Sequence, residues 1–451
     1  HNIVIGNKFT GQNIDDGSTD NIFIGSYVSD ATMADGQRNI GIGSSVFTEL
    51  TNTDDNVAIG YQAGNTGQGV MSVAIGGEAG EYLQGLASVA VGFRAGETGQ
   101  GDSNVAIGDN SGQISQGDSS VAIGDNSGNN TQGLSSVAIG DNCGNGYQGS
   151  FSVAIGDNSG NTGQGSSSVA IGDNCGNISQ GTSSIAIGDS AGYFLQGAES
   201  IALGLLAGFT GQGSSSIAIG NEAGRLGQRE MAIAIGYKAG HSGQNSGTVY
   251  VGEGAGINSQ TQNSICVGTY AGSFSQGFNS ISIGHSGGSY NQGNNAVAIG
   301  THAGYVNQGN KTVAIGFEAG ISGQSFNSVA IVTEAASFHQ EDGAVAIGRR
   351  AGHLIQGQNA IAIGTNAGFT GQENCAIALG ENAGYWEQNI GSIAIGTNAG
   401  FSGQLGIAIG VSAGYEDQGQ NAIAIGDRSG TFFQKNSAVA IGNFAGDTGQ
   451  D

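Results

Sequence analysis

Residues 121–136 read Val-Ala-Ile-Gly-Asp-Asn-Ser-Gly-Asn-Asn-Thr-Gln-Gly-Leu-Ser-Ser, and copies of this 16-residue unit account for nearly the whole chain. A Val-Ala-Ile-Gly block or a close variant opens each copy, 16 residues after the last, from Val57 to Ile393. One copy is shortened, so that only Leu405 and Gly406 separate its last glutamine from Ile407, and the copies before Val57 are 17 to 19 residues long. Together they make 28 copies. A fixed period of this kind is typical of a solenoid, in which each repeat packs only on its neighbours.

The pattern within one copy predicts two short strands and two turns. Positions 1 and 3 are β-branched or Leu and position 2 is usually Ala, an alternation that favours a strand. Glycine at positions 4 and 8 frames a turn, because glycine accepts a positive φ. We expect a second strand over positions 9–12 and a closing loop over positions 13–15. The copy that opens at Val329 has Val332 and Ala336 in place of both turn glycines, which predicts a distorted turn.

The fold class is therefore predicted to be all-β, a parallel β-solenoid of about 28 coils. Residues 1–56 would form longer, irregular coils, and residues 57–451 one continuous regular domain. Coils spaced about 4.8 Å apart would give a rod of roughly 130 Å. No helical periodicity and no apolar run long enough for a membrane helix interrupts the pattern, so membrane insertion of this segment is not expected.

Glutamine occupies position 12 of every copy from Val57 onward. A side-chain amide carries both a donor and an acceptor, so stacked glutamines can bond the amides above and below them. We predict a glutamine ladder; the alternative is that each glutamine caps a turn within its own coil. The first ten members of the row are Gln68, Gln84, Gln100, Gln116, Gln132, Gln148, Gln164, Gln180, Gln196 and Gln212.

One coil is too small to stabilise itself. Burial of the Val and Ile at positions 1 and 3 would contribute roughly 3–6 kcal/mol, whereas ordering 16 backbone units costs on the order of 16–32 kcal/mol. Coil-to-coil hydrogen bonds and packing must supply the rest. Ala at position 2 faces the other way, and we expect this second surface of small residues to carry the packing of several chains side by side.

Composition and charge limit the partners. The chain has 88 glycines, no proline, 11 Lys plus Arg and 35 Asp plus Glu, for a formal charge of -24. An acidic surface would repel nucleic acid and anionic membranes, so neither is an expected partner. The six histidines and four cysteines show no catalytic or zinc-binding spacing, and Cys143 and Cys175 lie two coils apart, too far for a disulfide. We therefore expect no enzymatic activity and no cofactor other than the calcium considered below.

The Ser-Val-Ala-Ile-Gly blocks at 72–76, 136–140 and 152–156 resemble the head-domain repeats of trimeric autotransporter adhesins, the YadA-like or haemagglutinin-type repeats. The blocks also resemble the fibre repeats of phages and large viruses. The resemblance implies a left-handed β-roll, homotrimeric assembly, and a structural or adhesive role on a cell or virion surface. By this implication the chain is extracellular and its main partner is a copy of itself, with a surface glycan or receptor as a further candidate.

Position 5 carries the same carboxylate in six consecutive copies, and no Lys or Arg lies between Arg94 and Arg225 to offset the repulsion. One hypothesis is a row of oxygen-rich Ca²⁺ sites, completed by the adjacent asparagines. The alternative is that each carboxylate is solvated and bonds backbone amides of its own turn. This aspartate row consists of Asp109, Asp125, Asp141, Asp157, Asp173 and Asp189.

Aromatic residues gather at positions 9 and 10 of the later copies. Tyr385, Trp386 and Phe401 are candidates for stacking on the sugar rings of a glycan; the alternative is packing within the protein. Two other functions compete with a fibre. A tailspike-type glycan-processing enzyme would need an inserted loop or clustered carboxylates, and an ice-binding solenoid would need a regular array of Thr, which is sporadic here.

Overall fold

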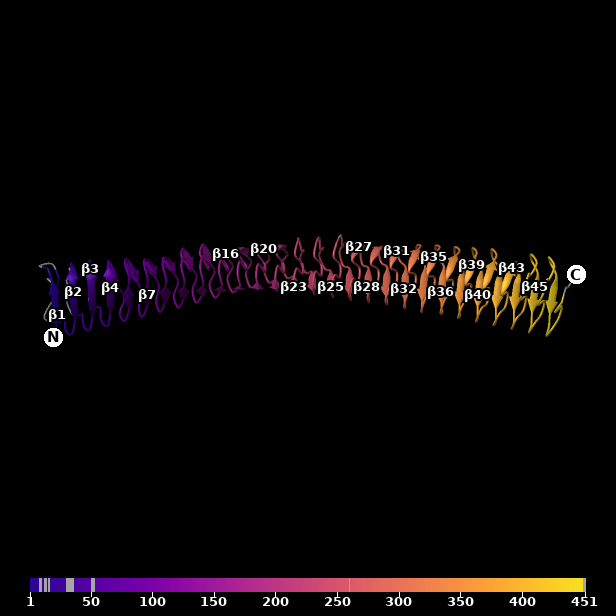
Figure 1. Ribbon diagram of the computed structural model, residues 1–451, viewed down its shortest axis with the longest axis horizontal. Helices are drawn as coiled ribbons and strands as arrows, with labels where there is room; N and C mark the ends of the chain where they lie inside the picture. Colours follow the sequence, from indigo (N-terminus) through magenta and orange to yellow (C-terminus); the bar gives the residue numbers. More distant parts are fainter. Residues whose placement is uncertain are drawn as a thin grey trace. The chain divides into compact units, whose positions relative to one another are not determined.

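The computed structural model describes residues 1–7, 10–11, 14, 17–29, 36–49, 53–258 and 260–448, in two compact units, His1–Met231 and Ala232–Asp451. Every named element is a β-strand, and the strand pairings of these residues are parallel. Within each unit the strands follow one another in chain order, one coil after the next (Figure 1). The predicted fold, an all-β parallel solenoid with a repeat of about 16 residues, is confirmed.

In the first unit the strands that open each copy form one parallel sheet and the shorter strands at positions 10–12 form another of nine strands. The opening strands are β1 (Ile3–Gly6), β2 (Ile22–Ser26), β3 (Ile40–Ser44), β4 (Val57–Tyr61), β5 (Val73–Ile75), β7 (Val89–Val91), β9 (Val105–Ile107), β11 (Val121–Ile123), β13 (Val137–Ile139), β15 (Val153–Ile155), β17 (Val169–Ile171), β19 (Ile185–Ile187), β21 (Ile201–Leu203) and β23 (Ile217–Ile219). The short strands are β6 (Tyr82–Gln84), β8 (Thr98–Gln100), β10 (Ile114–Gln116), β12 (Thr131–Gln132), β14 (Tyr147–Gln148), β16 (Thr162–Gln164), β18 (Ile178–Gln180), β20 (Phe194–Gln196) and β22 (Thr210–Gln212).

The second unit repeats this plan, again with a nine-stranded sheet of short strands. Its opening strands are β24 (Ile233–Ile235), β25 (Val249–Val251), β26 (Ile265–Val267), β28 (Ile281–Ile283), β30 (Val297–Ile299), β32 (Val313–Ile315), β34 (Val329–Ile331), β36 (Val345–Ile347), β38 (Ile361–Ile363), β40 (Ile377–Leu379), β42 (Ile393–Ile395), β44 (Ile407–Ile409), β45 (Ile423–Ile425) and β46 (Val439–Ile441). Its short strands are β27 (Phe274–Gln276), β29 (Tyr290–Gln292), β31 (Val306–Gln308), β33 (Ser322–Gln324), β35 (Phe338–Gln340), β37 (Leu354–Gln356), β39 (Thr370–Gln372), β41 (Trp386–Gln388) and β43 (Ser402–Gln404).

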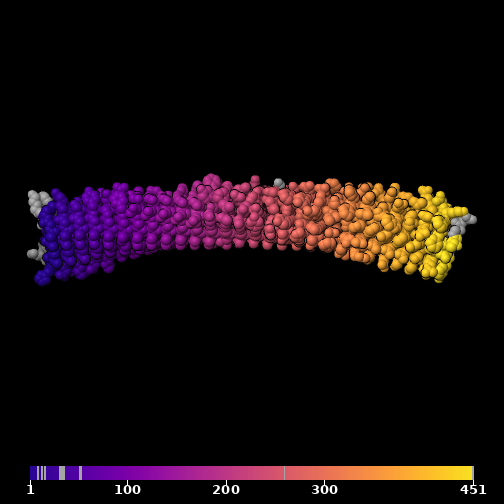
Figure 2. Space-filling view, viewed as in Figure 1, coloured from indigo at the N-terminus to yellow at the C-terminus, as the bar shows by residue number. Residues whose placement is uncertain are grey.

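Identical repeat positions stack on one another in register. Val121 pairs with Val137 and Ala122 with Ala138, and in each unit the successive coils follow as transverse bands (Figure 2). Glycine at position 4 is required by this close approach as well as by its φ. Gly124 has a φ of 124°, and a Cβ added there would lie 2.5 Å from the carbonyl oxygen of Gly140 in the next coil.

Positive φ is not confined to the two glycines. Positions 6, 11 and 15 are also left-handed, with φ of 51° at Asn126, 56° at Ser115 and 58° at Ser119. The sequence analysis missed these three bends. Their signal was the recurrence of Asn, Ser and Gly at these positions, because asparagine tolerates the left-handed region better than most residues.

The interior of each coil is lined by its small residues, and our expectation about the two faces of the opening strand is wrong. Ala122 and Ala154, at position 2, are fully buried, whereas the position 3 residue Ile107 is 38% exposed. Position 7, with Ser, Cys or Ala, and the glutamine of position 12 complete the interior. A 16-residue coil with two short strands encloses little volume, so beside the buried glutamine the interior holds mostly small side chains, with Tyr250 as an exception at position 2, and Val and Ile are directed outward.

The copy that opens at Val329 keeps its hydrogen bonds in spite of Val332. The backbone N–H of Val332 donates to Ile315, and that of Gly348 donates to Ile331, at 2.7 and 3.0 Å. Val332 has a φ of 89°, against 130° and 129° at the equivalent Gly316 and Gly348. The departure is therefore confined to the turn, while the strand register on both sides is unchanged.

Candidate association surface and side-chain rows

The outward side of the opening strands is an apolar strip of Val, Ile and Leu. Side chains at positions 1 and 3 are half-buried or exposed in copy after copy, for example 38% at Ile107 and 39% at Ile363. Each coil adds about 4.8 Å by about 7 Å to the strip, so a dozen coils present roughly 400 Å². An apolar patch of that size on one surface generally marks an interaction site.

The glutamine of position 12 caps its own coil from within. In most copies its Nε2 donates to the carbonyl of the position 1 residue eleven places earlier, for example Gln84 to Val73 at 2.9 Å and Gln180 to Val169 at 2.8 Å. Each of these glutamines is almost fully buried. The side chain thus ties the second strand of a coil to the first, which is the alternative that the sequence analysis had left open.

The predicted ladder is also present, and it is most regular in the second unit. Each Nε2 donates to the Oε1 of the next glutamine over an unbroken run of seven residues, at 3.0–3.2 Å. In the first unit one such bond is formed, from Gln100 to Gln116. Cap and ladder are therefore combined in the same side chain rather than exclusive. The run consists of Gln292, Gln308, Gln324, Gln340, Gln356, Gln372 and Gln388.

Both ends of the ladder coincide with irregular copies. At its start, Ser282 replaces the usual Ala of position 2 and its hydroxyl lies 2.7 Å from Oε1 of Gln292. At its end, Gln388 precedes the shortened copy that opens at Ile393, and its Nε2 bonds only Ile377 and Ser392 among its described contacts. The run therefore ends where the repeat is irregular, although the regular coils of the first unit, which also have Ala at position 2, form only one such bond among their described residues.

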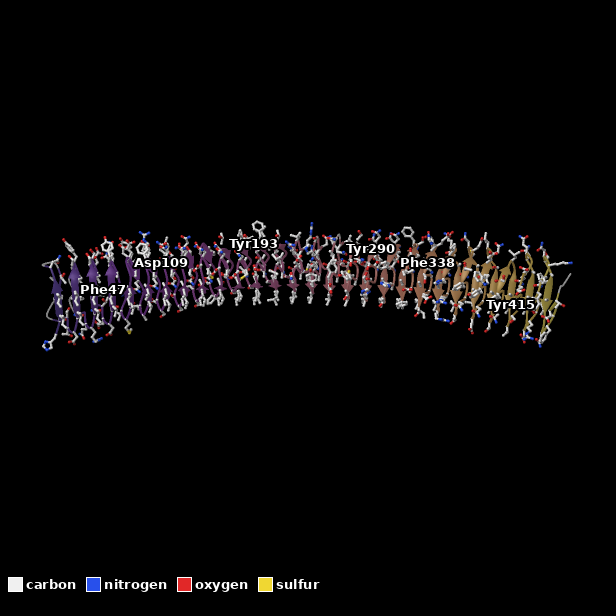
Figure 3. All side chains as sticks on the ribbon, viewed as in Figure 1. Phe47, Asp109, Tyr193, Tyr290, Phe338 and Tyr415 are labelled. Atoms are coloured by element: carbon white, nitrogen blue, oxygen red, sulfur yellow. The ribbon has the colours of Figure 1, made fainter. Side chains whose placement is uncertain are left out.

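The aspartate row points into solvent. All six carboxylates are exposed, and Asp109 is visible at the surface in Figure 3. Within the described part of the chain, Asp189 is the member of the row that accepts a side-chain hydrogen bond, from Ser190 at 2.7 Å. The row is not drawn together into a set of three or more ligand atoms. The calcium hypothesis stays a prediction, and the amide bonds of its alternative are not formed in these residues.

The structure gathers a different set of carboxylates, which the sequence analysis did not identify. Ligand atoms of Glu78, Glu81 and Glu97 lie within 4.8 Å of one another. Arg94 offsets this charge, with its Nε 2.6 Å from Glu78 and 3.8 Å from Glu97. The carboxylate of Glu78 in turn raises the pKa of the Arg94 guanidinium. Residues at positions 6 and 9 of successive copies meet here, a proximity visible only once the register is known.

The three aromatic candidates lie together at the surface of the second unit. Tyr385 is stacked between Phe369 and Phe401, at centroid distances of 4.8 and 5.0 Å, and Phe401 in turn stacks on Tyr415. Both faces of Tyr385 and Phe401 are therefore covered by neighbouring rings, which favours the packing alternative for these two. Trp386 stands edge-on to Tyr385 and is 44% exposed.

A hollow lies over positions 11–13 of four successive copies, the shortened copy among them. A space of about 500 Å³ is lined by Glu387, Leu405 and Asp417 among others. The hollow is acidic, in keeping with the charge of the whole chain.

Two thiols lie within the coils of the first unit. Burial raises the pKa of Cys143 to about 12 and that of Cys175 to about 11. Ser159 occupies the coil between them, with its hydroxyl 3.2 Å from the Cys175 sulfur. All four cysteines of the chain are free thiols, and Cys375 is exposed.

Comparison with known protein families bears on this geometry. Residues 356–367 and 418–445 match the YadA head domain repeat, in two copies. The chain carries YadA head repeats. A comparison with curated proteins finds no match. The matched segments contain β38 and β45, whose outward side chains are part of the apolar strip. They also contain Gln356, Gln418 and Gln434 of the glutamine row.

YadA head repeats suggest an adhesin-like fibre exposed at a surface, and the solenoid fold agrees with that role. Adhesins of this type are generally trimeric, which supports self-association. The described residues contain no helix that is long and apolar enough to cross a membrane.

Proposed function

We propose that this chain is a structural and adhesive segment of a surface fibre, extracellular or on a virion, and that it assembles as a homotrimer through its apolar strip rather than through the alanines of position 2. The observation that carries the proposal is the outward direction of Val and Ile at positions 1 and 3, seen at Ile107 and Ile363. No catalytic role is included in the proposal.

The strip suits association between copies of the same chain. Its side chains are mostly β-branched, regularly spaced and uncharged, so two strips can interdigitate without burying a charge. The chain as a whole is acidic and would repel another copy, so an uncharged strip that continues from coil to coil is a favourable place for contact. Burial of such a strip also supplies the stabilisation that a single coil lacks.

The test is sedimentation and light scattering of the chain and of two acidic variants. Ile107→Asp combined with Ile139→Asp charges the strip, and Leu134→Asp makes the same chemical change at a loop residue that is 48% exposed. We expect the unmodified chain and Leu134→Asp to be trimeric. The double variant should be monomeric and should retain the β-sheet circular dichroism spectrum, because both substitutions lie outside the coil interior. A folded unmodified chain that stays monomeric at tens of micromolar would refute the proposal.

A further inference from the structure

Two histidines that are far apart by repeat position lie in contact in the second unit. His285 is at position 5 of its copy and His302 at position 6 of the next, so one coil plus one residue separates them. Their ring centroids are 5.6 Å apart at an interplanar angle of 72°. The backbone N–H of His302 donates to the carbonyl of His285 at 3.0 Å, so the hydrogen-bonded stacking of coils holds the spacing of the two side chains.

This spacing fits two imidazoles bound to one metal ion. A tetrahedral Zn²⁺ with Zn–N bonds of about 2.0–2.1 Å places the centroids of two ligand rings about 5 Å apart. The observed separation is therefore reached with small side-chain rotations and no movement of the backbone. Neutral imidazole is a preferred ligand of Zn²⁺, Cu²⁺ and Ni²⁺.

A carboxylate and an aromatic ring surround His302. The Oε1 atom of Glu318, one coil further on, lies 3.9 Å from Nδ1 of His302. The ring of Tyr305 packs against the same imidazole at 5.2 Å and against Tyr290 at 5.3 Å. At 3.9 Å this contact is not a hydrogen bond, but a small side-chain rotation would bring the carboxylate to Nδ1, where it would orient the histidine and leave the other ring nitrogen for a metal, as at many protein metal sites. Tyr290 is labelled at this region of the surface in Figure 3.

We propose that His285 and His302 chelate one divalent transition-metal cation per chain, with Glu318 as a positioning residue for His302. His285 is exposed and the His302 side chain is 35% exposed, so a cation reaches the pair from solvent. The remaining coordination positions are left to water. This site is separate from the aspartate row and from the apolar strip.

The experiment is calorimetric titration of the folded chain with Zn²⁺ alone, in a His1→Ala background that removes the terminal imidazole. We expect one site per chain. His285→Ala and His302→Ala should each abolish its heat, because one imidazole is a poor ligand on its own. His339→Ala is the matched control: this exposed histidine comes from the same unit, and its removal should leave the isotherm unchanged.

Glu318 is tested separately. Glu318→Ala should weaken Zn²⁺ binding about tenfold, as expected for loss of a carboxylate that orients a ligand histidine. Glu318→Gln keeps an oxygen acceptor and should recover part of the affinity, whereas a purely structural role would move the metal-free melting temperature in both variants. The chelate is overturned if His302→Ala binds Zn²⁺ like the unmodified chain, or if only one of the two histidines matters.

Discussion

The glutamine row allows a comparison of the same residue with and without ladder bonds. Gln340 donates to Val329 at 2.8 Å, to Ala344 at 3.0 Å and to Gln356 at 3.0 Å, and it accepts from Gln324 at 3.0 Å. Gln180 has one described side-chain hydrogen bond, to Val169. Methionine is close to glutamine in size and has no strong donor or acceptor, so it removes these bonds and leaves little cavity.

The structure predicts different costs for the two substitutions. A typical buried hydrogen bond contributes about 1 kcal/mol net, so Gln180→Met should lower local stability by about 1 kcal/mol. Gln340→Met removes four bonds, some of them shared by the same N–H, and leaves Oε1 of Gln356 without its donor. We expect a cost of about 3 kcal/mol there. The difference of about 2 kcal/mol corresponds to a factor of about 30 in a local opening equilibrium.

Native-state hydrogen exchange measures this quantity coil by coil, which a global melting curve of a repeat protein does not. The amide of Val329 reports on the Gln340 coil and that of Val169 on the Gln180 coil. Loss of protection should be about 30-fold greater for Gln340→Met than for Gln180→Met, on variants with unchanged circular dichroism. Equal losses in the two coils would show that the cap alone stabilises the coil and that the amide ladder adds nothing.

Three further predictions concern single features. Val332→Gly should stabilise its turn by about 1 kcal/mol, because relief of a positive φ outweighs the flexibility that glycine gives the unfolded chain; slower exchange at the following coil checks it. Cys375 should react with iodoacetamide at pH 8, whereas Cys143 and Cys175 should stay unmodified because burial raises the pKa of these two thiols. The same raised pKa values affect the free energy of unfolding. The stabilisation from the two protonated thiols is complete below about pH 9 and is progressively lost as the pH rises toward 12. For the aspartate row, calcium and sodium chloride at equal ionic strength should raise the melting temperature equally, and an increase specific to calcium would support the metal hypothesis instead.

Much of the fold could be predicted from the sequence because the same residue types recur at the same positions of successive coils. The period placed β11 and β13 in register, the glycines at positions 4 and 8 indicated positive φ, and the glutamines indicated a buried amide row. The inward face of the strand could not be predicted in this way. Alternation shows that Ala122 and its neighbours Val121 and Ile123 face opposite sides, but it does not show which side is the interior. We placed the larger side chains inside, and the small volume of the coil reverses that choice.

Side chains brought together by register were equally hard to predict. His285 and His302 occupy different repeat positions, so a search along one position passes over them. The sequence showed a run of aromatic residues at position 9 around Tyr385. It did not show that neighbouring rings cover both faces of Tyr385, because that depends on the distances between coils. Sequence patterns predict what repeats, whereas contacts between unlike positions require the coordinates.

The in-register stacking of identical positions also affects how such a chain can change in length. Each regular 16-residue coil presents the same pattern of donors and acceptors to the coil on either side, as the pairing of Val137 with both Val121 and Val153 illustrates. Removal or duplication of a whole 16-residue unit would rejoin matching edges and leave no amide unpaired. The number of copies can therefore change by whole units while the remaining coils keep their pairing. In the proposed fibre, the length of this segment would then be set by the number of repeats, while the fold and the apolar strip stay the same.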